Sequence, residues 1–299
     1  MNVLITTSSF GDEAIQVLQD SGFEVIKNPY KRKITQSELK SLLEGVVGVI
    51  AGLEKYDYDI LSKSKLKVIS RCGSGISNID LNGAKELNIS VYNTPDGPTQ
   101  SVAELTIGCL LTLIRDVSNT NNLMHRGKWQ KVTGHQLKDL KVLLIGFGRI
   151  GRRVGKILDA IGAEILVYDP FLSEDKIPEN FTKIDLNNGI KIADVITLHS
   201  SGEDPIIGGK EFRLMKQGVF ILNVARGGLI NEKELEKALN SGKVKGAWID
   251  TFKEEPYAGS LTKYDQVLLT PHIGSYSIEG RKKMELDAVN NLIQGMKIY

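Results

Sequence analysis

The sequence predicts an α/β protein with two doubly wound parallel sheets. Short runs rich in β-branched residues alternate with helical patterns along the whole chain of 299 residues. Such alternation is typical of parallel sheets whose two faces are covered by helices. The chain is long enough for two domains of ordinary size, and its two halves open with similar segments. These observations favour two domains over one.

A first series of strands and helices fills the first third of the chain. Between its strands the helical pattern is clearest at residues 12–20 and 36–43. The apolar runs are short and bounded by turn residues, as in strands buried on both faces. The strands of this series are expected at residues 3–6, 24–27, 46–51, 67–70 and 89–92.

A second series begins at Lys141, after a long apolar helix predicted over residues 98–114. Its strands are expected at residues 142–145, 164–168, 195–198, 219–223, 246–249 and 267–269. A final helical stretch, residues 277–296, follows the last strand, and we expect it to return to the first sheet. The sequence therefore predicts a domain of residues 98–280 inserted into a discontinuous domain of residues 1–97 plus 281–299.

The opening segments of the two series can be laid against each other. NVLITTSSFGDEAIQVLQDSGFEVIKNP and KVLLIGFGRIGRRVGKILDAIGAEILVYDP both contain a strand, a turn, a helix, a glycine and a second strand followed by a polar residue and proline. The first copy lacks spaced glycines, and it has Asn28 where the second has Asp169. Only the second copy therefore carries the features of a nucleotide site.

The glycine motif of the second copy indicates dinucleotide binding. Gly146, Gly148 and Gly151 follow an apolar strand and open a helix, and Asp169 ends the next strand. The first glycine allows a tight turn, the second lets a pyrophosphate approach, and the third lets the helix pack on the strand. The Asp169 carboxylate can accept from ribose hydroxyls and would repel a 2′-phosphate, so NAD is favoured over NADP. The cofactor-binding residues predicted here are Gly146, Gly148, Arg149, Ile150, Gly151 and Asp169.

Three further motifs follow the later strands of the same sheet. NVARGG occupies residues 223–228, DTFKEEPY residues 250–257 and TPHIGS residues 270–275. Each begins at or just after the carboxyl end of a predicted parallel strand, the edge where open α/β sheets bind ligands. An arginine, a carboxylate and a histidine are therefore expected to meet beside the nicotinamide.

Together with the glycine motif, these segments closely resemble the D-isomer-specific 2-hydroxyacid dehydrogenases, including the 3-phosphoglycerate dehydrogenases among them. The resemblance covers nearly the whole chain and includes RCGSGISNID, NTP, SVAEL, GKW and LMKQG, in the order of the family. It implies a Rossmann cofactor domain inserted in a discontinuous, flavodoxin-like substrate domain. It also implies NAD as cofactor and a homodimer built on the cofactor domains.

The resemblance assigns a role to each residue of the strand-end motifs. Arg226 is expected to clamp the substrate carboxylate, since its planar fork can bind a carboxylate through two hydrogen bonds. His272 is expected to be the general acid/base, and Glu255 to orient it. Asp250 matches the residue that orients the nicotinamide carboxamide. An open alternative is that Arg226 only forms a structural ion pair with Glu255.

A loop of the first domain is expected to bind the substrate as well. The resemblance implies that the loop from Cys72 to Ser77, with Cys72, Ser74 and Gly75, binds the substrate carboxylate through backbone N–H groups, and that Ser74 also faces the cofactor. Arg71 stands directly before this loop and is expected to reach the substrate through its side chain. Arg71 leaves the substrate open: it can recognise a phosphate, or it can bind a neighbouring acid. The expected reaction is hydride transfer between nicotinamide and a D-2-hydroxy or 2-oxo acid of the 3-phosphoglycerate, glyoxylate or hydroxypyruvate type.

A regulatory protein remains an alternative to an enzyme. A protein that senses NAD(H) without turnover would keep the same fold. In addition, SSGEDPIIGG after His199 is shorter than the corresponding family segment and lacks its usual proline and threonines, which leaves the cofactor contacts near residues 200–209 unassigned. Formate dehydrogenases are disfavoured, because they carry glutamine at the position of Glu255.

Composition excludes several other functions. The net charge of +2 and the interspersed charges give no basic tract for nucleic acid and no patch for a membrane surface. The two cysteines, Cys72 and Cys109, form no disulfide or metal pattern, and no metal site is predicted. The first residues lack the features of a signal peptide, so we expect a cytoplasmic protein.

Overall fold

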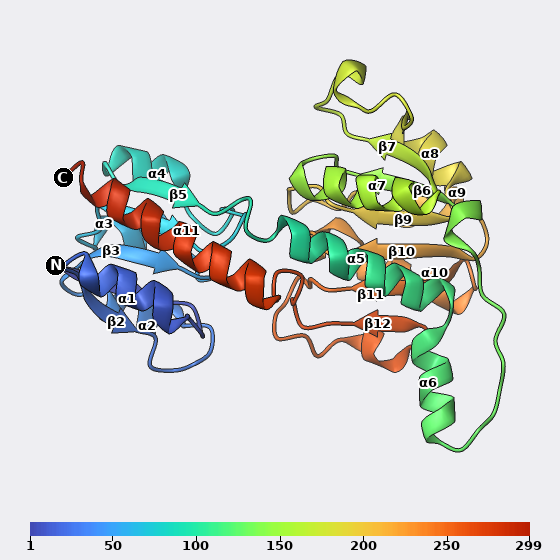
Figure 1. Cartoon of the computed structure of the whole chain (residues 1–299), viewed down its shortest axis with the longest axis horizontal. Helices are drawn as coiled ribbons and strands as arrows, with labels where there is room; N and C mark the ends of the chain where they lie inside the picture. Colours follow the sequence, from blue (N-terminus) through green and yellow to red (C-terminus); the bar gives the residue numbers. More distant parts are fainter. The chain divides into compact units, whose positions relative to one another are not determined.

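The computed structural model describes all 299 residues and divides into two compact units (Figure 1). Unit 1 comprises Met1–Pro98 and Ser275–Tyr299, and unit 2 comprises Thr99–Gly274. The boundary expected at residues 280/281 lies inside helix α11 (Ile278–Met296), whereas the units divide just before that helix. No helix combines the length and apolar character needed to cross a bilayer.

Unit 1 is a five-stranded parallel sheet in the order β2-β1-β3-β4-β5. Helices α1 (Asp12–Asp20) and α11 pack on one face, where Leu18, Val289 and Leu292 meet the sheet. The other face is covered by α2 (Gln36–Leu42), α3 (Tyr58–Ser62) and α4 (Leu81–Glu86). The strands are β1 (Asn2–Ile5), β2 (Glu24–Lys27), β3 (Val46–Ala51), β4 (Val68–Arg71) and β5 (Ser90–Asn93).

Unit 2 is a seven-stranded parallel sheet in the order β12-β11-β10-β9-β6-β7-β8. Helices α5 (Thr99–Ile114) and α7 (Arg149–Ile161) cover one face. Helices α8 (Leu186–Ile192), α9 (Gly209–Leu214) and α10 (Glu232–Asn240) cover the other. The strands are β6 (Lys141–Ile145), β7 (Glu164–Tyr168), β8 (Thr182–Lys183), β9 (Val195–Leu198), β10 (Val219–Asn223), β11 (Val244–Ile249) and β12 (Val267–Leu269).

The strand order of unit 2 reverses between β6 and β9, which are neighbours in the sheet but not in the sequence. From β6 the chain first builds outward through β7 and β8, and it then returns to build β9 to β12 on the other side. In open α/β sheets the crevice at such a reversal, at the carboxyl ends of the strands, is where ligands bind. The turns that follow β6 and β9 are therefore the first place to search for a site.

The two predicted sheets are confirmed, and the predicted strands lie within two residues of the observed ones. Strand β8 was not predicted, because two exposed residues carry no apolar pattern. Helix α6 (Val117–His125) was also not predicted, since none of its side chains is buried and it has no apolar face toward a core. Buried strands were predicted well because burial on both faces makes them continuous apolar runs.

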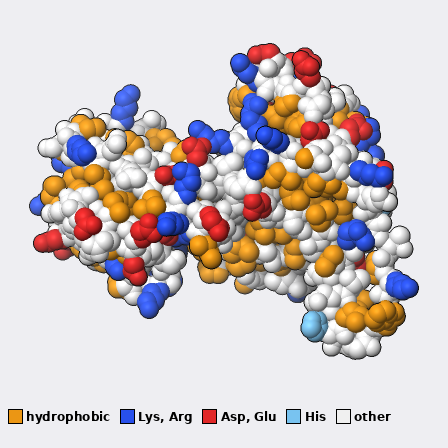
Figure 2. All heavy atoms as spheres, in the orientation of Figure 1, with side chains coloured by type: hydrophobic (Ala, Val, Ile, Leu, Met, Phe, Trp, Pro, Cys, Tyr) orange, Lys and Arg blue, Asp and Glu red, His pale blue; other side chains and the backbone are white.

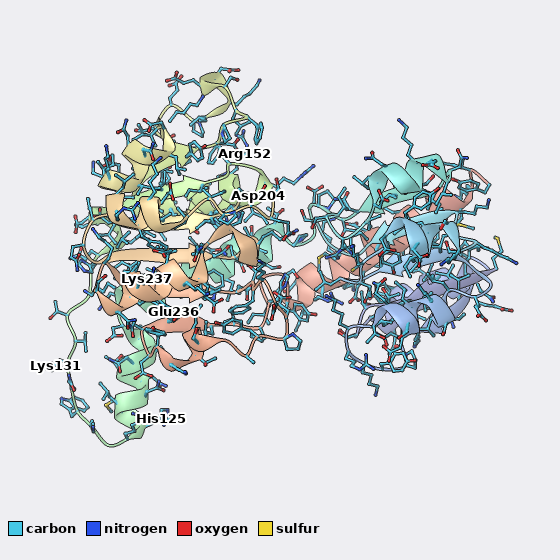
Figure 3. All side chains as sticks on the ribbon, turned by 180° about the vertical axis from the view of Figure 1, so that it is seen from behind. His125, Lys131, Arg152, Asp204, Glu236 and Lys237 are labelled. Atoms are coloured by element: carbon cyan, nitrogen blue, oxygen red, sulfur yellow. The ribbon has the colours of Figure 1, made fainter.

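We call residues 117–135, which contain α6 and the segment after it, the α6 arm. The arm extends away from the sheet of unit 2 (Figure 1), and Figure 3 shows His125 and Lys131 near its far end. Hydrophobic side chains gather at that end in Figure 2. Val117, Met124, Trp129 and Val132 of the arm are exposed, Trp129 to 80%.

Candidate active site

The turn between β6 and α7 requires glycine at two of its three glycine positions. Gly146 has φ +91°, and a Cβ there would lie 2.6 Å from the Ser200 backbone nitrogen. A Cβ on Gly151 would lie 2.2 Å from the carbonyl oxygen of Gly146. Both positions bring backbone against backbone, so no other side chain fits without a shift of the turn.

Gly148 differs, because no protein atom lies within 4 Å of a Cβ built on it. It is the N-cap of α7, and no side chain caps that helix end. The first N–H groups of a helix and the positive end of its dipole favour an anion. Gly148 therefore leaves a close approach to the N-terminus of α7, and the turn fits the pyrophosphate of a dinucleotide.

Asp169 lies directly after β7 and lines a surface pocket of about 330 Å³. Its carboxylate accepts from the backbone N–H of Phe147 at 2.9 Å and of Phe171 at 3.0 Å, which fixes it beside the glycine turn. Three carboxylates and only one cation line the pocket, a balance that disfavours a 2′-phosphate. The lining residues are Tyr168, Asp169, Pro170, Glu174, Lys183, Ile184 and Asp185.

The other two predicted members of the turn have different surroundings. Arg149 is exposed and opens α7, and Ile150 is half-buried and packs on the core of that sheet face. The arginines that follow are already engaged: Arg152 donates to the carbonyl of Lys176, and Arg153 donates to Gln100.

His199 stands at the end of β9, against the glycine turn. Its Nε2 lies 3.0 Å from the Thr197 hydroxyl, while its Nδ1 is buried without a hydrogen-bond partner. Burial lowers the pKa of His199 to about 3. The ring is therefore neutral near pH 7 and forms a wall of the turn.

His272 and Glu255 form a hydrogen-bonded pair at the same sheet edge. Nδ1 of His272 lies 3.0 Å and 3.1 Å from the two carboxylate oxygens of Glu255, and one of those oxygens also accepts from the backbone N–H of Phe252. A carboxylate on Nδ1 fixes the ring orientation and leaves Nε2 for a reactant. The ring is partly exposed, so a reactant can reach it.

Arg226 follows β10 and makes no ion pair, so the structural bridge to Glu255 is not formed. Its guanidinium donates to the carbonyl of Ala225 at 2.7 Å, and the Asn223 side chain donates to the carbonyl of Arg226. Gly227 lets this loop pack on the next one, because a Cβ there would lie 2.0 Å from the backbone of Phe252. Arg226, Glu255 and His272 thus follow the adjacent strands β10, β11 and β12.

Asp250 is fully buried after β11. Its carboxylate accepts from the Thr270 hydroxyl and from the backbone N–H groups of Ile273 and Gly274. The sequence suggested a contact with nicotinamide for Asp250, and the structure adds three bonds to the turn that carries His272. Trp248 and Thr270 complete this arrangement and were not singled out from the sequence, although the alternation Trp-x-Asp on a strand is a signal for a shared face.

In unit 1, the predicted substrate loop follows β4. Cys72 is buried, and burial raises the pKa of its thiol to about 11, so it is not a reactive thiolate. Gly73 has φ +142° and donates its N–H to the Thr94 hydroxyl. Ser74 is exposed and Gly75 is half-buried, and their backbone N–H groups donate to no protein acceptor.

Arg71 is only 9% exposed and donates to the carbonyl of Cys72. Burial raises the pKa of the Glu54 carboxyl, and the nearby positive charge of Arg71 lowers it in part. Glu54 is 2% exposed and accepts from the Thr6 hydroxyl and the Gly52 N–H. The sequence did not predict this buried acid, because a single glutamate in a loop is usually exposed to solvent.

Comparison with known proteins identifies the family. Residues 107–274, more than half of the chain, match the D-isomer specific 2-hydroxyacid dehydrogenase NAD binding domain. The chain belongs to this family. The matched segment holds the glycine turn, Asp169 and the Arg226, Glu255 and His272 set, and NAD is the cofactor.

Three relatives show how far the similarity extends. The D-3-phosphoglycerate dehydrogenase of Methanocaldococcus jannaschii is 36% identical over 289 residues, which are 93% of this chain and 54% of that protein. The hydroxypyruvate reductase of Thermotoga maritima is 34% identical over 94% of this chain and 96% of that enzyme. The D-lactate dehydrogenase of Aquifex aeolicus, solved with NAD and lactic acid, has a TM-score of 0.85 at 26% identity and covers 97% of this chain and 93% of its own.

The extent of these matches differs between relatives. The chain spans about half the length of the phosphoglycerate dehydrogenase but nearly the whole of the hydroxypyruvate reductase. Both family membership and the two-sheet fold therefore apply to the full chain, while the choice of substrate depends on the residues of the site.

Proposed function

We propose that this dehydrogenase-family chain transfers a hydride between NAD and a short D-2-hydroxy acid or its 2-oxo acid. The observation that carries the proposal is the pair formed by His272 Nδ1 and Glu255, 3.0 Å apart, on the loops that follow adjacent strands. A protein that only sensed NAD(H) would have no use for a carboxylate that orients a partly exposed histidine.

The residues divide the reaction between them. Bound NADH supplies the hydride. Arg226, with its guanidinium outside any ion pair, binds the substrate carboxylate through two hydrogen bonds and so fixes the keto carbon. His272 donates a proton from Nε2 to the substrate oxygen, and Glu255 accepts from Nδ1 and stabilises the charged ring. In the oxidative direction the same nitrogen accepts the proton.

The cofactor is assigned to the turn after β6. Gly146, Gly148 and Gly151 receive the pyrophosphate, together with Arg149 and Ile150 at the start of α7. Asp169 binds the adenosine ribose, and Asp250 keeps one lone pair for the nicotinamide amide. In unit 1, the N–H groups of Ser74 and Gly75 are the candidates for a carboxylate, and Cys72 fills the adjacent small-residue position.

We propose that the substrate is a short, unphosphorylated 2-oxo acid of the hydroxypyruvate or glyoxylate type. Arg71 is only 9% exposed and donates to the carbonyl of Cys72, so it is poorly suited to hold a phosphate dianion. The similarity to a hydroxypyruvate reductase over 96% of that enzyme supports the same choice. Arg71 is then a support of the loop that carries Ser74.

A substrate panel tests the proposal. NADH oxidation with glyoxylate, hydroxypyruvate, pyruvate and phosphohydroxypyruvate should give kcat/KM at least about tenfold higher for one of the unphosphorylated acids than for the phosphorylated one. Absence of turnover with every acid, despite measurable NADH binding, would instead support a sensor.

Substitution of the acid/base pair completes the test. His272→Gln keeps a hydrogen-bonding side chain of similar size but cannot shuttle a proton, so kcat should fall by about a hundredfold or more while NADH binding survives. Glu255→Gln should lower kcat less and change the pH profile. Near wild-type turnover of His272→Gln would mean that another group donates the proton.

We also propose that the protein works in the cytoplasm as a homodimer that buries the α6 arm. The arm exposes Trp129, Met124 and Val117, and such a set of apolar side chains on one segment is typical of an interface. Trp129→Glu should convert a dimer to a monomer in sedimentation equilibrium, and the exposed Lys131→Glu should not. A monomeric wild type would overturn the dimer.

A further inference from the structure

We propose that Trp248, Thr270 and Asp250 form a positioning relay that fixes the backbone turn carrying His272. The inference rests on the proposed function, in which His272 exchanges the substrate proton. None of the three residues needs to touch the substrate to act in this way. Their effect is transmitted through the backbone of residues 270–274.

The relay begins inside the sheet. Trp248 is fully buried, and its indole Nε1 donates to the Thr270 hydroxyl at 2.9 Å. That hydroxyl donates to Oδ1 of Asp250 at 2.5 Å. Trp248 lies near the end of β11 and Asp250 directly follows the strand, two residues on, so that the two side chains point to the same face. Strand β12 pairs with β11 so that Trp248 lies opposite Leu268, and the next residues of the chain bring Thr270 opposite Asp250.

The relay has one direction only. An indole N–H can donate but cannot accept, so the Thr270 hydroxyl must accept from it and is left to donate to Asp250. A hydroxyl without this constraint can rotate toward other acceptors. Trp248 therefore sets the orientation of the Thr270 proton, and this orientation strengthens the bond to the buried carboxylate.

Asp250 then binds both sides of the catalytic turn. One carboxylate oxygen accepts from the Ile273 N–H and the other from the Gly274 N–H, each at 2.9 Å, while Thr270 is bound through its side chain. His272 lies between these points with φ +55°, a left-handed conformation that non-glycine residues disfavour. The backbone N–H of His272 donates to the Thr270 carbonyl, which closes the turn.

Two anchors thus define the position of the imidazole. Asp250 holds the Thr270 side chain before His272 and the backbone N–H groups of Ile273 and Gly274 after it. Glu255 fixes Nδ1 of His272. Both carboxylates belong to the segment that follows β11. Because proton transfer is sensitive to displacements of about 1 Å, loosening of the backbone anchor should lower turnover without removing any group that binds substrate.

The experiment compares two substitutions of Thr270. Thr270→Val removes the hydroxyl and keeps the shape, and kcat for the best 2-oxo acid should fall about tenfold or more, while KM and the Kd for NADH change by less than about threefold. Thr270→Ser keeps the hydroxyl and should retain kcat within about threefold. Wild-type kcat in Thr270→Val, or an equal loss in both variants, would overturn the relay.

Two further variants separate positioning from stability. Trp248→Phe keeps most of the ring volume and loses only the donor, and it should lower kcat in the same way as Thr270→Val. Thr262→Val is the matched control, because its exposed hydroxyl donates to the carbonyl of Gly259 and lies outside the relay. A loss of thermal stability with unchanged kcat in Trp248→Phe would count against the proposal.

A readout that does not need turnover distinguishes this inference from the proposed function. The hydrogen-bonded Nδ1 proton of His272 should give a low-field resonance in the NADH complex of the wild type and of Thr270→Ser, and the resonance should be lost in Thr270→Val. A wild type with this pattern but without turnover would overturn the proposed function and keep the relay. An unchanged resonance in Thr270→Val would overturn the relay alone.

Discussion

The first turns of the two sheets start from similar sequence and end in opposite electrostatic states. In unit 1 the N-terminus of α1 is bound by a carboxylate of the chain itself, since the Gly11 N–H donates to Glu285 of α11 at 2.8 Å. Asp12 and Glu13 add negative charge to the same first turn. In unit 2 the N-terminus of α7 has no side-chain cap and no acid in its first turn.

The difference explains why only one of the two units binds a dinucleotide. A helix N-terminus attracts anions, but α1 already satisfies this attraction with Glu285, which is buried and held by Arg281 at 2.6 Å. Helix α7 has no side-chain cap and no acid in its first turn, and the space around Gly148 is open. A shared fold therefore fixes where an anion can bind, and a few side chains determine whether one does.

The largest expected effect comes from closing the turn of unit 2. A Cβ in Gly151→Ala would lie 2.2 Å from a backbone oxygen, which cannot move without the turn. The Kd for NADH should rise about a hundredfold or more, equivalent to about 2.8 kcal/mol, and this can be measured by fluorescence titration.

Gly11→Ala is the matched substitution in unit 1. Its Cβ would lie 2.8 Å from a side-chain oxygen of Glu285, which can adjust. This variant should bind NADH like the wild type and lose only some thermal stability. If both alanine variants weakened NADH binding equally, the contrast between the two turns would be wrong.

The sequence predicts most of what distinguishes the two turns. The three glycines and Asp169 lie close together in the sequence, and their spacing matches a known turn geometry. The cofactor turn can therefore be predicted from the sequence. The hydrogen bond between Gly11 and Glu285 joins residues 274 positions apart, and no local sequence pattern predicts it. The same holds for the Thr270 and Asp250 contact, and for the buried Glu54 beside Arg71, because long-range hydrogen bonds depend on strand order and register.

A second prediction concerns the residues that end the second strand of each unit. Asn28 in unit 1 is structural: its amide donates to the carbonyls of Thr6 and Arg32. Asp169 in unit 2 lines the pocket beside the glycine turn. With the proposed function, the protein should therefore prefer NADH to NADPH by at least about tenfold in kcat/KM, roughly 1.4 kcal/mol.

Variants of the two positions sharpen this comparison. Asp169→Asn should reduce the preference, because the repulsion of a 2′-phosphate is lost. Asn28→Asp should lower stability, since a carboxylate would face two carbonyl oxygens, and should leave the preference unchanged. Equal kcat/KM for the two cofactors in the wild type would refute the role given to Asp169.

The smallest expected effect is an opposite pH dependence of stability in the two units. Burial lowers the pKa of His199 in unit 2 to about 3, below the ordinary 6.5. Below pH 6.5 the His199 ring therefore binds a proton in the unfolded chain but not in the folded unit. Stability falls as the pH falls through this range. Burial raises the pKa of Glu54 in unit 1 above its ordinary 4.5. The folded unit then binds the proton more readily, and stability is lost as the pH rises through the raised pKa.

Two variants isolate these contributions in thermal unfolding at pH 7 and pH 5. The stability of His199→Gln relative to the wild type should be higher at pH 5 than at pH 7, because the variant lacks the imidazole that must stay neutral in the folded unit. The stability of Glu54→Gln relative to the wild type should be higher at pH 7 than at pH 5, because the variant lacks the buried carboxylate charge. The two differences should have opposite signs. Differences of the same sign would show that one of the two side chains is not buried in the way that the contrast between the units requires.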